Sequence, residues 1–224
     1  MAVLDGGFGR IRVDLQTTSG ELVAVEAEPT QATALARTIV GLADPLAGEV
    51  SVGGVPVTEE DPGKRLIGYV PADDSLLPSL SVQRNIWYGV RAAVRRDRLF
   101  RDRWLGLARR HRGDRLTRDL VDRLTAALGL GPTLHLHPHE LEDGQRFHVA
   151  MVRAVARKDE VIVVDMPKPI PGALRPRQVL ERIRGAVDST AILTMVVCSA
   201  DRAVLAGVDR VVPVTPTPSG GSER

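Results

Sequence analysis

The stretch from Val23 to Leu42, VAVEAEPTQATALARTIVGL, contains the pattern that decides the fold. It opens within a continuous apolar run, residues 21–25, which favours a buried strand. A helix is predicted at about residues 30–42, and Glu28-Pro29 marks its start because proline fits the first helical position. A connection of this kind that binds phosphate is rich in glycine and carries a lysine. This connection contains neither, and it has two glutamates.

Strand patterns recur on both sides of a long helical region. Ser81 is a candidate cap for the first helix of that region, and residues 142–158 form an amphipathic helix that places Phe147, Met151 and Val155 on one face. A further helix is predicted near residues 174–186. The predicted strands are 10–16, 21–25, 48–52, 55–58, 65–70, 160–165, 190–197 and 208–214.

Strands interleaved with helices predict a mainly parallel α/β core that an all-helical insertion interrupts. We assign residues 1–80 and 158–214 to the α/β core and residues 81–157 to a helical subdomain. Residues 215–224 are rich in Pro, Gly and Ser, and we expect them to form a disordered tail.

The composition is that of an ordinary globular protein. Hydrophobic residues make up 43% of the chain but aromatic residues only 3%, so Val, Leu, Ile and Ala must build the core. The single cysteine, Cys198, excludes an internal disulfide and indicates a reducing compartment. No signal-peptide pattern is present, and no apolar run approaches the roughly 18 residues that cross a bilayer. We therefore expect a cytoplasmic protein.

Five stretches, in order and at the right spacing, resemble the nucleotide-binding domain of ABC transporters. They are ARTIVGLADPLAGEVSVGGVPV, RLIGYVPADDSLLPSLSVQRNIWYGVR, HELEDGQRFHVAMVRAVAR, VIVVDMP and ADRAVLAGVDRVV. The resemblance covers nearly the whole chain. It implies a P-loop NTPase-like core with a mainly parallel sheet, an antiparallel β edge and an inserted helical subdomain.

The family's phosphate loop, G-x-x-x-x-G-K-[ST], corresponds to residues 26–33. Glu26 takes the place of the first glycine, Gln31 of the second and Ala32 of the lysine, and only Thr33 matches. The glycines let backbone amides approach phosphate, and the lysine reaches the β- and γ-phosphates. The resemblance therefore implies a loop that has lost its phosphate-binding groups.

Other catalytic positions of the family are replaced as well. The resemblance places Ala72 at the glutamine that holds metal and attacking water, and Met166 at the general-base glutamate, whose proton-accepting role a thioether cannot take. Ala200 stands in place of the late histidine. The metal-associated aspartate is present as Asp165.

The family's signature, L-S-G-G-Q, reads LEDGQ in residues 141–145. Gly144 and Gln145 match, while Glu142 and Asp143 replace a serine and a glycine that face the γ-phosphate of a partner's ATP. Together with Thr33 and Asp165, Gly144 and Gln145 are the vestiges of a nucleotide site. The two acidic substitutions place negative charge where that phosphate would lie.

These replacements predict a catalytically inactive ABC-type homologue that serves as a structural or regulatory subunit of a transporter-like complex. ATP and Mg²⁺ are the family's cofactors, but we expect this chain to bind neither. The resemblance implies a membrane permease or an active ABC ATPase subunit as partner, with a homodimer as an alternative, and a peripheral position at the membrane through that partner. The alternative function is a weak ATP-binding subunit that hydrolyses ATP only within a complex.

Docking is expected at Leu76, Leu77, Trp87 and Tyr88, because the family receives a permease helix in this region and these side chains are suited to interfaces. The competing interpretation is that they fill the core of the helical region.

Three further features have competing readings. In residues 91–118 arginines far outnumber aspartates. This Arg-rich segment fits a solvated amphipathic surface better than a site for nucleic acid or another anionic partner. His135, His137 and His139 are interpreted as loop residues and not as a metal site. Cys198 is interpreted as a core residue.

Overall fold

The computed structural model describes residues 2–5, 10–73, 75–99, 114–186 and 193–216. At its centre lies a five-stranded sheet in the order β10-β3-β9-β8-β7, in which every neighbouring pair is parallel. Its strands are β3 (Leu22–Glu26), β7 (Ile67–Val70), β8 (Val161–Asp165), β9 (Thr194–Ser199) and β10 (Arg210–Pro213). The apolar runs that predicted strands form β3, β8 and β9, and these strands are buried, as expected for parallel strands covered on both faces.

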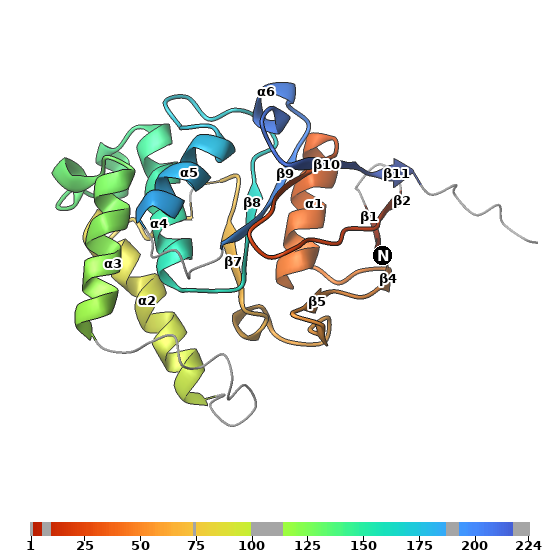
Figure 1. Cartoon of the computed structure of the whole chain (residues 1–224), viewed down its shortest axis with the longest axis horizontal. Helices are drawn as coiled ribbons and strands as arrows, with labels where there is room; N and C mark the ends of the chain where they lie inside the picture. The colour runs from red at the N-terminus through yellow and green to blue at the C-terminus, as the bar shows by residue number, and fades with distance from the viewer. Residues whose placement is uncertain (1, 6–9, 74, 100–113, 187–192, 217–224) are drawn as a thin grey trace, which may run out of the picture.

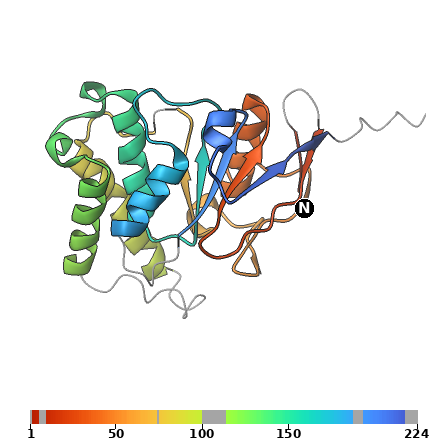
Figure 2. The same ribbon diagram turned by 45° about the horizontal axis from the view of Figure 1, so that its top comes forward.

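Helices cover both faces of this sheet (Figure 1). Helix α1 (Pro29–Val40) packs against β8 and β9 on one face, and α4 (Asp143–Ala156) packs against β7 on the other. Alternate residues of β3 follow this division: Ala24 joins the cluster that contains α4, and Val25 joins the cluster that contains α1. The turned view in Figure 2 keeps the same order of layers.

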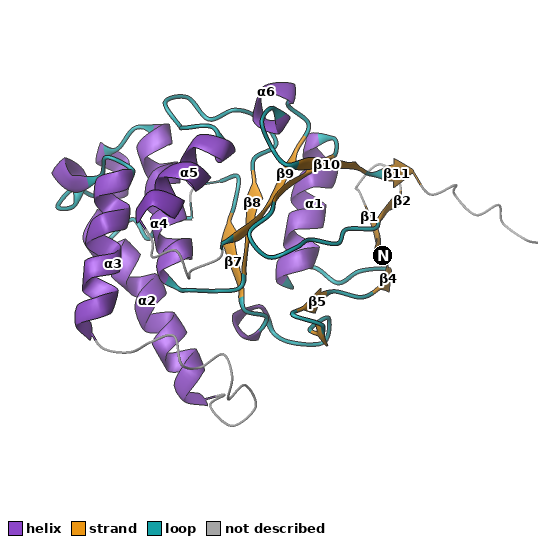
Figure 3. Cartoon of the chain, in the orientation of Figure 1, coloured by secondary structure: helices purple, strands orange, loops and turns teal. Residues whose placement is uncertain are grey.

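Helices α2, α3 and α5 gather around α4, as the purple ribbons of Figure 3 show, while α6 packs against β9. Helix α2 packs against α4, and α3 packs against α4 and α5. Their apolar side chains share one hydrophobic cluster with the sheet. The bounds are α2 (Val82–Leu99), α3 (Asp114–Ala127), α5 (Pro176–Ala186) and α6 (Arg202–Leu205), with 3-10 turns at Pro62–Lys64, Gly131–Thr133 and Pro138–Glu140. No helix in the described part of the chain combines the length and apolarity that crossing a membrane requires.

An antiparallel layer lies beyond α1, in the order β11-β2-β1-β4, with a separate hairpin of β5 and β6. The strands are β1 (Ala2–Asp5), β2 (Arg10–Val13), β4 (Ala47–Gly48), β5 (Ser51–Val52), β6 (Val55–Pro56) and β11 (Thr215–Pro216). The strand predicted at residues 48–52 is thus two short strands in different sheets, because β4 pairs with β1 and β5 pairs with β6. Strand β1 was not predicted.

The prediction of a disordered tail from residue 215 was wrong for its first two residues. Thr215 and Pro216 form β11, which pairs with β2 through Arg12 and Ile11. Proline is tolerated there because β11 is the edge strand of its sheet. The prediction for residues 217–224, the centre of the Arg-rich segment at residues 100–113, and the start of the strand predicted at residue 190 lie outside the described residues.

Candidate functional site

The predicted strand-to-helix connection runs from β3 to α1. Strand β3 ends at Glu26, and α1 already begins at Pro29, so only Ala27 and Glu28 lie between them. In the P-loop motif the helix follows the G-x-x-x-x-G-K-[ST] segment. Here the positions of the second glycine and the lysine, Gln31 and Ala32, lie inside the first turns of the helix.

A capping box closes the start of α1. The Glu28 carboxylate faces the amide of Gln31, and the Gln31 Oε1 atom accepts the Glu28 N–H at 3.3 Å. This pairing has the form of a capping box, with glutamate in the place of the usual serine or threonine, and its hydrogen bond engages the Glu28 amide. The side chain of Glu28 thereby supplies a negative charge at the positive end of the helix.

Most amides between residues 27 and 32 are already engaged. The Ala27 N–H donates to the Ser199 carbonyl at 3.1 Å, and the Ala32 N–H donates to the Glu28 carbonyl at 2.8 Å. Pro29 has no N–H, and the amides of Glu28 and Gln31 serve the capping box. The amides that already have an acceptor within the chain are not free to donate to a phosphate group.

Asp165, at the end of β8, is held by side chains from two other elements. The Thr33 hydroxyl donates to its Oδ1 atom at 3.2 Å, and the Tyr69 hydroxyl donates to Oδ2 at 3.4 Å. The carboxyl is only 1% exposed. Burial raises the pKa of Asp165, because the charged form loses its hydration, while the hydrogen bonds from Thr33 and Tyr69 act in the opposite direction.

The other predicted catalytic positions differ in burial. Met166 is buried in the hydrophobic cluster, and its N–H donates to the Cys198 carbonyl at 3.0 Å. Ala72 is exposed in the loop after β7, and Ala200 is half-buried after β9. A methyl group at each of the last two positions offers neither a hydrogen-bond donor nor an acceptor.

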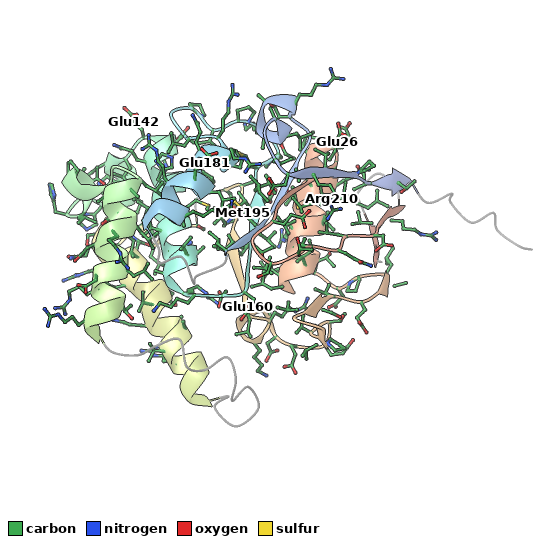
Figure 4. All side chains as sticks on the ribbon, in the orientation of Figure 1. Glu26, Glu142, Glu160, Glu181, Met195 and Arg210 are labelled. Atoms are coloured by element: carbon green, nitrogen blue, oxygen red, sulfur yellow. The ribbon has the colours of Figure 1, made fainter. Side chains whose placement is uncertain are left out.

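The signature-like segment forms the start of α4 and has a second capping box. Glu142 precedes the helix, its carboxylate faces the Gln145 amide, and the Gln145 Oε1 atom accepts the Glu142 N–H at 3.0 Å. The sequences EPTQ (28–31) and EDGQ (142–145) thus fold in the same way at two helix N-termini. Figure 4 shows Glu26 and Glu142 toward the upper side of the molecule, near the starts of α1 and α4.

A strap that follows β8, residues 166–174, lies against the start of α4. Gly144 and Gly172 are in such close contact that a Cβ atom on Gly144 would lie 2.2 Å from the Gly172 carbonyl carbon. Two residues on, the Leu174 N–H donates to the Nε2 atom of His148 at 3.0 Å. Burial, with a smaller effect of the Arg182 charge, lowers the pKa of His148 to about 4, so its imidazole is neutral and acts as an acceptor at pH 7. A pocket of about 390 Å³ lies between this strap, α4 and the loop after β7.

The loop between β7 and α2 is held from two helices. Asn85 of α2 is fully buried; its Oδ1 atom accepts the Leu77 N–H at 2.8 Å, and its Nδ2 atom donates to the carbonyls of Leu77, Leu80 and Ser81 at 2.9–3.2 Å. Arg153 of α4 donates to the carbonyl and the hydroxyl of Ser75 at 2.8 and 2.6 Å.

The four residues predicted to dock a partner differ in exposure. Leu76 is only 6% exposed and belongs to the core, which removes it from any surface. Leu77 and Trp87 are half-buried, and Trp87 packs against the core cluster. Tyr88 is 53% exposed. Of the four, Leu77, Trp87 and Tyr88 therefore have side chains that are at least partly exposed, and Leu76 does not.

The remaining candidates lie apart from this network. His137 and His139 stack with ring centres 5.9 Å apart, and the His137 N–H donates to Glu140 at 2.7 Å. Among the described residues, no group of three or more His, Cys, Asp and Glu side chains is arranged around a common metal position. Cys198 is buried, and burial raises the pKa of its thiol.

Sequence reasoning missed four residues of this site: Tyr69, Asn85, His148 and Arg153. Each is a polar residue within an otherwise apolar helical or strand pattern, and that interruption of the pattern could have pointed to these positions. A buried polar side chain needs a partner. The partners here are backbone groups and residues far along the chain, which a periodic pattern does not identify.

Strand order, helix placement and the strand-to-helix connection beside Asp165 define an α/β cassette of the P-loop NTPase class. The family model described as ABC transporter matches residues 32–168. The chain therefore belongs to the ABC transporter family, and the resemblance inferred from its sequence is confirmed.

Curated relatives support this assignment. The chain is 32% identical to a molybdate/tungstate import ATP-binding protein of Archaeoglobus fulgidus over 71% of this chain and 60% of the relative. It is 31% identical to a sulfate/thiosulfate import ATP-binding protein of Caulobacter vibrioides over 91% of this chain and 58% of the relative. It thus spans somewhat more than half the length of these two relatives.

Solved structures share the fold. A dimeric ATP-binding cassette in a post-hydrolysis state with ADP and phosphate superposes with a TM-score of 0.66 over 96% of this chain and 94% of that chain, at 19% identity. The predicted fold class, with a mainly parallel sheet, antiparallel strands at the edge and inserted helices, is confirmed.

Proposed function

We propose that this chain is a nucleotide-independent subunit of an ABC transporter-like complex, with a structural or regulatory role. The observation that carries the proposal is the pair of capping boxes, Glu28 with Gln31 and Glu142 with Gln145. In the family, the first helix start faces the chain's own ATP and the second faces the ATP of a partner. In this chain both helix starts already have an anion, supplied by a glutamate side chain.

The charge of these glutamates opposes phosphate. A helix N-terminus attracts an anion with a free energy of roughly 0.3–1 kcal/mol at an exposed position. A carboxylate about 4 Å from a phosphate charge repels it by roughly 1 kcal/mol in water and by about 4 kcal/mol at an effective dielectric constant of 20. The repulsion therefore equals or exceeds what the helix end contributes, and no lysine at position 32 offsets it.

Hydrolysis would also lack its chemical groups. Phosphoryl transfer depends on positioned charge and metal ions. The family's lysine, glutamine, glutamate and histidine positions hold Ala32, Ala72, Met166 and Ala200. The residues of this site do not fit ATP with Mg²⁺, and no catalytic step is assigned to them.

A second candidate function is weak ATP binding by a subunit that is active only within a complex. One observation favours it: Thr33 and Asp165, the two family residues that hold Mg²⁺ in P-loop enzymes, are both present and hydrogen-bonded at 3.2 Å. That hydrogen bond equally explains their presence without a metal ion, because the buried carboxylate needs a donor.

Nucleotide binding by the purified chain separates the two functions. Calorimetric titration with ATP, with and without Mg²⁺, is expected to give no micromolar binding, whereas an intact ABC ATPase under the same conditions binds. Micromolar binding that Mg²⁺ strengthens would overturn the proposal. In that case Asp165→Asn should abolish the Mg²⁺ effect, while the exposed change Glu181→Gln on α5 serves as the matched control.

The proposed partner is a membrane permease or an active ABC ATPase subunit, with a homodimer as the alternative, and the chain would lie at the membrane through that partner. Support for docking by the helical region comes from the aromatic pair, Trp87 and Tyr88, beside the doubly held loop at residues 75–81. Tyr88→Ala should leave the melting temperature unchanged and weaken co-purification with the proposed permease partner. Full retention of the partner by that variant would exclude Tyr88 as an anchor.

A further inference from the structure

The pocket beside the strap has no role in the proposed function. Its walls are formed by residues 70–73, 75 and 76 at the end of β7 and after it, by the first half of α4, and by strap residues 168–171. Its volume is about 390 Å³. Pockets that bind small molecules have volumes of roughly 300–1,000 Å³ and mostly apolar walls with a few polar groups. We call this space the strap pocket.

The inner wall of the strap pocket is apolar. Leu76, Phe147 and Ala150 line the pocket, are each at most 6% exposed and belong to the core cluster. Ile170 of the strap lines it as well and packs against the same cluster. An apolar group that enters the pocket exchanges water for this apolar surface, which favours its binding.

The walls of the strap pocket are held in place by α4. Arg153 of α4 donates to the carbonyl and the hydroxyl of Ser75 at 2.8 and 2.6 Å, which fixes the loop after β7. His148 of α4 accepts the Leu174 N–H at 3.0 Å, which fixes the end of the strap. A site whose walls are already ordered loses little conformational entropy when a ligand binds.

Among the described residues, four charged side chains line the strap pocket, two of each sign. Two of them neutralise each other, because the Arg146 guanidinium donates to the Asp143 carboxylate, and Arg146 also donates to the Leu141 carbonyl at 2.7 Å. The other two, Asp73 and Lys168, are exposed, and neither forms a hydrogen bond or an ion pair with another residue in the described part of the chain. The pocket therefore offers a ligand one carboxylate and one ammonium group that are not paired with each other.

We infer that the strap pocket binds a small zwitterion with an apolar body, of the class of a free amino acid or a short peptide. The carboxylate of the ligand would meet the Lys168 ammonium group, its own ammonium group would meet the Asp73 carboxylate, and its apolar part would pack on the inner wall. A simple acid would be attracted by Lys168 but repelled by Asp73, and for a simple amine the signs are reversed. A ligand that carries both charges is attracted at both positions.

Calorimetric titration of the full chain tests the class of ligand. The probes are L-phenylalanine and the dipeptide Leu-Leu, each with its N-acetylated form, which lacks the ammonium group, and its amide, which lacks the carboxylate. At least one of the two zwitterions is expected to bind with a dissociation constant at or below about 1 mM, and its two blocked forms at least about fivefold more weakly. No binding of either zwitterion in that range, or equal binding of a blocked form, would overturn the inference.

Removal of single charges locates the two contacts. Lys168→Gln should weaken the zwitterion at least about threefold, so that it binds no more tightly than its amide, and Asp73→Asn should do the same relative to the N-acetylated form. Both side chains are exposed, so both variants should keep the wild-type melting temperature. Arg202→Gln and Glu181→Gln each remove one charge at an exposed position outside the pocket and should leave binding unchanged. Equal weakening by these controls would refute the assigned contacts.

Filling the strap pocket gives a test that does not depend on charge. Ala72 lines the pocket and is exposed, so Ala72→Phe should fold normally and abolish binding of the zwitterion. Ala203→Phe adds the same side chain at an exposed position of α6 and should leave binding unchanged. Wild-type binding by Ala72→Phe would mean that the ligand lies elsewhere and would overturn the inference. ATP titration reports on the proposed function separately, because no residue of the β3–α1 connection lines this pocket.

Discussion

Replacing Asn85 with alanine should remove much of what holds the loop before α2. The side chain is fully buried, accepts the Leu77 N–H and donates to three carbonyls of residues 77–81. Its amide has one acceptor and two N–H groups in use, so about three hydrogen bonds are lost at roughly 1 kcal/mol each. We expect Asn85→Ala to lower the free energy of unfolding by about 3 kcal/mol.

Urea denaturation and thermal melting measure this loss. For a chain of this length, about 3 kcal/mol corresponds to a melting temperature roughly 6–12 °C lower. Gln83→Ala is the matched control, since Gln83 is an exposed residue of the same helix and its change should be near neutral. Amide hydrogen exchange should also become faster for Leu77. A loss below about 1 kcal/mol, or unchanged exchange at Leu77, would refute the idea that Asn85 orders this loop.

Three further results are expected. Burial raises the folded-state pKa of Asp165 above its unfolded value of about 3.8, so the folded state holds the proton more tightly, and the stability of the wild type falls as pH rises from the unfolded to the folded pKa. Asp165→Asn should lack this decline in urea titrations from pH 3 to 7, and parallel curves for the two proteins would refute the expectation. Gly144→Ala places a methyl group against the Gly172 backbone and should cost about 1–3 kcal/mol in the same assay, whereas an unchanged midpoint would show that the strap is free to move. Ala32→Lys with Met166→Glu restores two family residues at buried positions and should lower the melting temperature without producing ATP hydrolysis. Phosphate release above background from this variant would contradict the proposed nucleotide-independent function.

The parts of the fold that could be predicted from the sequence are those with strong local patterns. The apolar runs of β3 and β8 and the Pro29 start of α1 identify buried strands and a helix boundary without reference to anything distant. Strand β11 could not be predicted, because its Thr-Pro sequence resembles the tail and only pairing with β2 makes it a strand.

The same distinction applies to the candidate site. The replaced residues at positions 26–33 could be located by counting along the motif. The capping box that closes this connection depends on where the helix begins, and the prediction of a start near residue 30 did not reveal it. Leu76 shows that residue type alone does not separate an interface residue from a core residue. It was predicted to anchor a partner because it is large and apolar, but it is buried and belongs to the core.

On the proposed function, the capping box at the start of α1 also makes a phosphate loop hard to gain by successive mutation. Glycine at position 31 would remove the side chain that accepts the Glu28 amide and would weaken the helix by about 0.8–1 kcal/mol before any phosphate loop exists. Lysine at position 32 would introduce a charge where Ala32 is fully buried. On the proposed function, each family residue is thus unfavourable here until the others are also present, so single substitutions would lower stability before they add any nucleotide binding.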